Sequence, residues 1–142
     1  MTNLTIFTDG GSRGNPGPAA CAFVVLDRDN VIFQEGFYLG TTTNNVAEYT
    51  AVLKAVEWLK KDSGDRTQVA EVCFNLDSLL VVQQLKGNFK IKDQKLKVLF
   101  DKIQSLISNL QFLISWNHIP REQNTIADLL VNNTLDGEHE NE

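Results

Sequence analysis

The chain is poor in cysteine and histidine, with two of each among its 142 residues, and it lacks any long apolar run. Cys21 and Cys73 lie far apart within apolar stretches, which argues against a zinc site or a disulfide framework and predicts two core residues. No apolar run approaches the roughly 20 residues of a membrane span, and the N-terminus lacks the pattern of a signal peptide. We therefore expect a soluble, cytoplasmic protein without a membrane partner.

Basic residues are also outnumbered, since 13 Lys and Arg stand against 18 Asp and Glu, giving a net charge of −5. Proteins that bind nucleic acid normally present a basic surface. However, the segment 136–142 holds four acids and no Lys or Arg. Four further acids, Asp9, Glu48, Asp77 and Asp128, are candidate metal ligands for the reasons given below. Without these eight, ten acids remain against 13 bases, so the acidity does not exclude a nucleic-acid partner.

Hydrophobic residues make up 42% of the chain, which is enough for one domain with its own core. Periodicity and turn residues predict strands at 3–9, 20–27, 31–39, 69–76 and 111–117, and helices at 44–61, 78–85, 93–110 and 124–135. The glycine- and proline-rich stretch 10–18 is predicted to be a loop. This order indicates an α/β fold, a mixed sheet with helices packed against it. We expect residues 1–135 to form the domain and residues 136–142 to form a disordered acidic tail.

Four carboxylates stand where a predicted strand ends or a predicted helix begins: Asp9, Glu48, Asp77 and Asp128. Each has an ordinary structural explanation. Asp9 could be a turn residue, Glu48 could complete a capping box with Asn45, Asp77 could cap a helix, and Asp128 could complement a helix dipole. Taken together, they come from separate segments whose ends can converge.

Carboxylates that converge beside a core repel one another unless a cation neutralises them. Oxygen ligands favour Mg²⁺ or Mn²⁺, and the chain has no Cys or His cluster that would favour zinc. Two such ions about 3.5–4 Å apart are a known device for cleaving phosphodiesters, because one activates a water and the other stabilises the leaving oxygen. The four acids therefore predict a site for two divalent cations.

Four blocks of sequence, taken in order, resemble the motifs of the type 1 ribonuclease H family: residues 7–19, 43–48, 77–78 and 118–128. The resemblance implies a ribonuclease H-like fold, a five-stranded mixed sheet flanked by helices, in a compact form without the basic insertion that some members carry. It implies that Asp9, Glu48, Asp77 and Asp128 are the metal-binding catalytic residues. The implied reaction is hydrolysis of the RNA strand of an RNA–DNA hybrid with two Mg²⁺ or Mn²⁺ ions, leaving RNA 5′-phosphate and 3′-hydroxyl ends. We expect a monomer that needs no protein partner.

The same resemblance assigns roles to neutral residues. His118 matches a histidine on a loop near the scissile phosphate, with packing between Trp116 and Pro120 as the alternative. A polar patch would contact the hybrid, although helix capping and loop closure would also explain its residues. The predicted substrate-binding residues are Gly10, Gly11, Ser12, Asn15, Thr43, Asn44 and Asn45.

Five lysines fall within twelve residues, at positions 86, 90, 92, 95 and 97, where they either bind DNA-strand phosphates or form a solvated face. Leu79 departs from the family, which often has glutamine there. Three alternatives stay open: an inactive domain that only binds, a nuclease of the same fold that acts on DNA, and a non-enzymatic metal-binding protein.

Overall fold

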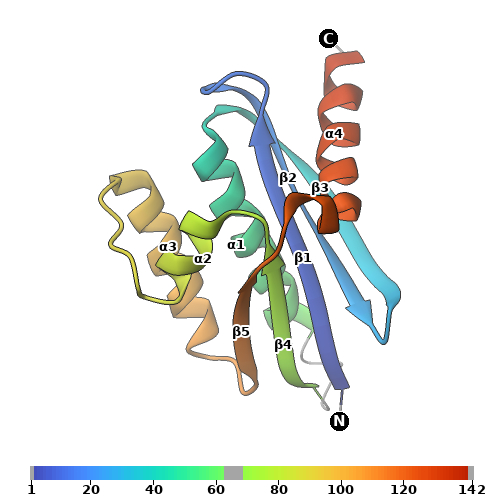
Figure 1. The fold of residues 1–142 in the computed structure, drawn as a ribbon, viewed down its shortest axis with the longest axis vertical. Helices are drawn as coiled ribbons and strands as arrows, with labels where there is room; N and C mark the ends of the chain where they lie inside the picture. Colours follow the sequence, from blue (N-terminus) through green and yellow to red (C-terminus); the bar gives the residue numbers. More distant parts are fainter. Residues whose placement is uncertain (1, 63–68, 141–142) are drawn as a thin grey trace.

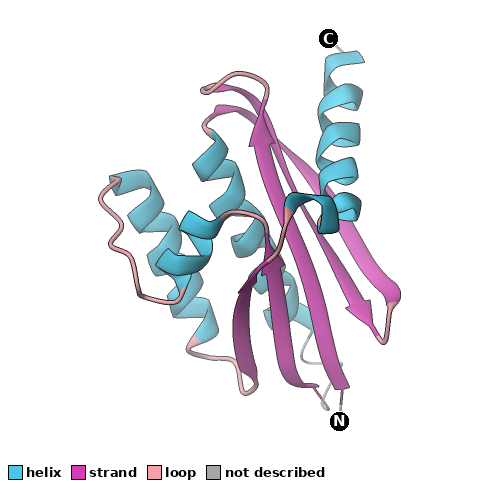
Figure 2. Cartoon of the chain, viewed as in Figure 1, coloured by secondary structure: helices cyan, strands magenta, loops and turns pink. Residues whose placement is uncertain are grey.

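The computed structural model describes residues 2–62 and 69–140, and side chains as far as residue 137. Its centre is a five-stranded sheet with the order β3-β2-β1-β4-β5 (Figures 1 and 2). The first three strands are antiparallel neighbours, whereas β4 pairs parallel to β1 and β5 pairs parallel to β4. The strands are β1 Thr2–Ser12, β2 Gly17–Asp27, β3 Asn30–Thr42, β4 Val69–Leu76 and β5 Leu113–His118. The predicted five-stranded mixed sheet is confirmed.

The helices cover the two faces of this sheet unequally. The first three lie together on one face, and the last packs on the other against β1, β2 and β3 (Figure 1). No helix in the described ranges is long and apolar enough to cross a membrane. The helices are α1 Asn44–Asp62, α2 Leu79–Leu85, α3 Gln94–Ile107 and α4 Thr125–Glu140, with a 3-10 turn η1 at Arg121–Gln123.

The main core lies between the sheet and α1, which is buried over most of its circumference, as its apolar pattern predicts. One buried polar link crosses this core. The Tyr49 hydroxyl donates to Gln84 Oε1 at 2.6 Å, and Gln84 Nε2 donates to the Lys90 carbonyl at 3.2 Å. This link joins α1 and α2 to the lysine-bearing loop that precedes α3. A smaller core on the opposite face packs α4 against β2.

Most predicted elements agree with the structure to within a few residues, and two differ more. The loop predicted at 10–18 shrinks to residues 13–16, because Gly10–Ser12 continue β1 and pair with Ala19–Cys21 of β2. The sequence pattern predicts that the last helix ends at 135, whereas α4 continues through residue 140. Residues 141–142 lie outside the described part.

The two cysteines are free, as predicted, but only Cys21 is fully buried. Burial raises the pKa of the Cys21 thiol to about 12, which keeps it protonated and unreactive. The prediction of a core position for Cys73 is wrong: it is half-buried, and its sulfur accepts a hydrogen bond of 2.7 Å from Asn117 Nδ2. Alternate side chains of β4 point to opposite faces of the sheet, so an apolar neighbourhood in sequence did not decide its burial.

Candidate active site

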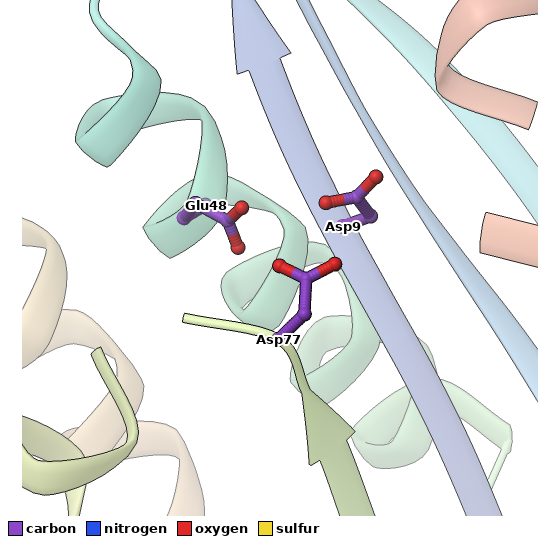
Figure 3. A group of neighbouring side chains, drawn as sticks. All are labelled: Asp9, Glu48 and Asp77. Atoms are coloured by element: carbon purple, nitrogen blue, oxygen red, sulfur yellow. The ribbon is translucent and has the colours of Figure 1, made fainter. Parts of the chain in front are cut away.

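Three of the four predicted carboxylates meet at one edge of the sheet. Asp9 lies near the end of β1 and Asp77 directly follows β4; because these strands are parallel, with Phe7 opposite Asn75, both acids emerge at the same end. Glu48 reaches them from the start of α1. Figure 3 shows the three side chains pointing toward one another. One oxygen of each lies within 4.8 Å of an oxygen of the others.

A glycine makes this approach possible. Gly10 follows Asp9, and a Cβ atom on it would overlap the backbone of Ala47 and Glu48. The backbone of β1 therefore touches the backbone of α1 beside the acids, which only a residue without a side chain permits. Gly10 is among the predicted substrate-binding residues; it lines the pocket around the acids and also allows the close approach of Asp9 and Glu48.

The metal-free cluster is electrostatically costly. Burial, with the nearby charges of Asp77 and Asp128, raises the pKa of Asp9 from 3.8 to about 7. Burial and the charges of Asp9 and Asp77 raise the pKa of Glu48 well above its ordinary value of 4.5. Glu48 Oε2 is buried without a hydrogen-bond partner among the described residues. Buried carboxylates that repel one another, one of them with an oxygen that lacks a donor, fit a hard divalent cation, which would neutralise them and bond to that oxygen.

Asp128, the fourth predicted acid, lies outside this group of three. It is half-buried in the first turn of α4, and its charge contributes to the raised pKa of Asp9. The structure thus places it beside the cluster rather than within it.

Sequence reasoning missed Asn124, the residue that joins these segments. Its side chain is 1% exposed, and Nδ2 donates to the Thr8 carbonyl at 2.8 Å and to Asp77 Oδ2 at 3.1 Å. The backbone carbonyl of Asn124 accepts a hydrogen bond from the Asp128 backbone N–H at 3.1 Å. Asn124 therefore holds the end of β1, the Asp77 carboxylate and the start of α4 together. The available signal was an asparagine at the start of a predicted helix, a position usually explained by capping alone.

Three of the ordinary explanations for the acids do not hold. Asp9 is not a turn residue, because it lies within β1 and pairs with Ala22 of β2. Ser78, not Asp77, caps α2, because its hydroxyl accepts from the Val81 N–H. Thr43 Oγ1 accepts from the Val46 N–H in the capping position of α1, so Glu48 is not the partner of an Asn45 cap. The explanation of Asp128 as a first-turn acid stays compatible with its position.

The predicted polar patch is a hydrogen-bonded unit. Asn44 Oδ1 accepts from both the backbone N–H and the hydroxyl of Ser12, at 2.8 and 3.0 Å, and the Asn44 N–H donates to Asn15 Oδ1 at 3.0 Å. The β1–β2 loop is thereby fastened to the start of α1. Gly11, Thr43 and Asn45 lie beside it, so all seven predicted substrate-binding residues are brought together.

A pocket of about 430 Å³ contains the three acids and part of this patch, and it continues along α4. His118 does not line it. The histidine is exposed at the end of β5, opposite Leu76, which excludes the alternative of a packed side chain. The five clustered lysines are all exposed, and Lys97 pairs with Asp101 at 3.2 Å. Leu79 is 51% exposed at the start of α2.

Comparison with known proteins agrees with this geometry. Residues 7–134 match the family described as reverse transcriptase-like. Ribonuclease HI of Halobacterium salinarum is 36% identical over 133 residues, which are 92% of this chain and 63% of that protein. A bifunctional protein of Mycobacterium tuberculosis is 37% identical over 135 residues, which are 94% of this chain and 35% of that protein. The chain thus spans less than two thirds of the length of these relatives.

Among solved structures, LC11-RNase H1 in complex with an RNA/DNA hybrid has a TM-score of 0.89 and 42% sequence identity, with coverage of 95% of this chain and 98% of that one. The residues matched by the family, 7–134, include all four predicted acids. The chain therefore belongs to the type 1 ribonuclease H family.

Proposed function

We propose that this protein hydrolyses the RNA strand of RNA–DNA hybrids and leaves RNA 5′-phosphate and 3′-hydroxyl ends. One observation carries the proposal: three carboxylates, two of them buried, lie within 4.8 Å of one another beside a polar patch. The hybrid bound to the similar LC11-RNase H1 supports the choice of substrate.

Asp9, Glu48 and Asp77 would hold the metal, with Asp128 contributing from the start of α4. Mg²⁺ or Mn²⁺ is the expected ion because all the donors are carboxylate oxygens. When two ions are bound, they supply Lewis-acid stabilisation of charge on the attacking and leaving oxygens. The protein's own contribution is to fix the ligand geometry through β1, β4, α1 and the Asn124 bridge.

The polar patch would read the minor groove of the hybrid. Asn44 and Asn45 are exposed beside the acids, and small polar side chains there can detect an RNA 2′-hydroxyl. Exposed His118, at the end of the strand next to Asp77, would carry a proton to or from the reacting phosphate. The exposed lysines that precede α3 and lie in its first turn would bind DNA-strand phosphates. We propose that the protein acts as a monomer in the cytoplasm.

The test is an assay on end-labelled RNA–DNA hybrid with Mg²⁺ or Mn²⁺, alongside duplex DNA and duplex RNA. The unaltered protein should cut only the RNA strand of the hybrid, and Asp77→Asn should cut little or nothing. Asp29→Asn is the matched control, since Asp29 lies in the β2–β3 turn and has a φ of 69°, which asparagine tolerates well. Cleavage of duplex DNA alone would show a DNA nuclease of the same fold. Equal activity in Asp77→Asn would refute the assigned site.

A further inference from the structure

Arg13 has no role in the site as described so far, yet it lines the same pocket as Asp9, Glu48 and Asp77. It begins the β1–β2 loop, and its side chain is 45% exposed. The guanidinium group forms an ion pair of 2.7 Å with Asp136 and a longer contact of 3.5 Å with Asn132 Oδ1. Both partners lie on α4, Asn132 at its middle and Asp136 one turn further on; this helix rises beside the loop in Figure 1. Asp136, an acid of the predicted tail, therefore pairs with an arginine that lines the pocket.

The backbone of Arg13 is held firmly in place. Its N–H donates to the Pro18 carbonyl at 2.8 Å, and the neighbouring Ser12 is bonded to Asn44. A Cβ atom on Gly17 would overlap the Arg13 carbonyl, so the two ends of the loop are in contact. The guanidinium thus projects from a fixed point next to the polar patch, and only its own side-chain torsions decide where it binds.

The ion pair with Asp136 is easily exchanged. Both side chains are about half exposed, and such pairs contribute at most about 1 kcal/mol. A phosphate diester offers the guanidinium two acceptor oxygens in the same forked geometry as a carboxylate. The hybrid is a polyanion and the pocket is lined by acids, so each cation beside the pocket strengthens hybrid binding.

We propose that Arg13 binds a backbone phosphate of the hybrid, and that Asp136 occupies its guanidinium in the free protein and must release it when substrate binds. This inference rests on the proposed function, because it names a further contact of the same site. It gives the acidic end of α4 a role as a competitor for the nucleic acid.

The first experiment measures hybrid affinity against salt concentration in an Asp77→Asn background, where cleavage is blocked. Arg13→Gln should weaken binding several-fold, and the slope of log K against log salt should become shallower by about 0.9, the change expected for one lost phosphate contact. Arg28→Gln is the matched control, because Arg28 is 88% exposed at the β2–β3 turn. Its slope should stay that of the parent protein.

The second experiment removes the competitor. Asp136→Asn should tighten hybrid binding by about two- to fivefold, the range set by an exposed ion pair. Asp29→Asn removes the same charge at a distance and should have a smaller effect. In the Arg13→Gln background the gain from Asp136→Asn should vanish, since no guanidinium remains to be released.

Cleavage kinetics separate this inference from the proposed function. In the otherwise unaltered enzyme, Arg13→Gln should raise KM and leave kcat unchanged. Two results would overturn this inference and leave the proposed function intact. In the first, the enzyme cuts the hybrid but Arg13→Gln binds it as tightly as Arg28→Gln does. In the second, Asp136→Asn tightens binding by the same factor in the Arg13→Gln background as in the parent protein. If the unaltered protein neither binds nor cuts the hybrid, the proposed function fails and this inference fails with it.

Discussion

Replacing Asp9 with asparagine should stabilise the metal-free protein at neutral pH, although the change destroys a proposed metal ligand. Asp9 is 6% exposed, and its pKa is about 7 in the folded protein against 3.8 as the ordinary value. The folded state therefore binds this proton more tightly than the unfolded state does. By linkage, the stability associated with Asp9 is fully present below pH 4 and is lost as the pH rises through 7.

The size of the effect follows from the pKa difference of about three units. At about 1.4 kcal/mol for each unit, the charged Asp9 carboxylate costs the folded protein up to about 4 kcal/mol at pH 8. Asparagine keeps a similar shape and carries no charge at any pH. The variant should be more stable than the unaltered protein by up to this amount at pH 8, and the difference should approach zero at pH 4.

The assay is urea unfolding in the presence of EDTA at several pH values between 4 and 8, with Asp29→Asn as a control that should change little. Adding Mg²⁺ should narrow or reverse the difference, because the ion binds the folded unaltered protein more tightly than the variant. If Asp9→Asn destabilises the metal-free protein equally at pH 4 and pH 8, the acid cluster is not under electrostatic strain and the reasoning is wrong.

Three further substitutions test how the site is held. Gly10→Ala should destabilise the protein by about 3 kcal/mol or more and abolish cleavage, since the added methyl overlaps the α1 backbone; thermal unfolding measures this. Asn124→Ala should lower the free energy of unfolding by about 1–3 kcal/mol, because Asp77 loses a buried donor. It should also weaken metal binding, which titration calorimetry measures. Tyr49→Phe should cost a similar amount in urea unfolding, because Gln84 is left buried with an unpaired oxygen. The matched controls, in the same order, are Gly137→Ala, where an added Cβ meets nothing within 4 Å, Asn109→Ala and Tyr38→Phe.

The sequence predicts the strands and helices of this fold well because their apolar periodicity is regular. It also predicts which acids stand at the ends of elements. It does not predict distances between them: the convergence of Asp9 and Asp77 depends on the parallel pairing of β1 with β4, and the approach of Glu48 depends on the contact at Gly10. Proximity of this kind is a property of tertiary packing, which local patterns do not encode.

The differences between the predicted and the observed features have a common physical cause. Gly10 to Ser12 carry loop-forming residues, yet hydrogen bonds to β2 hold them in an extended strand. The acidic tail has a composition typical of disorder, yet α4 continues into it and Asp136 pairs with Arg13. Asn124 looks like an ordinary helix cap, and only the structure reveals its bond to Asp77. In each case a long-range contact overrides a local preference.

The most direct test of the account is the location of divalent metal in the protein. We predict that anomalous diffraction from crystals grown with Mn²⁺ will show a metal peak bound by the carboxylates of Asp9, Glu48 and Asp77. Manganese bound only elsewhere, with these three acids free of metal at saturating concentration, would contradict it.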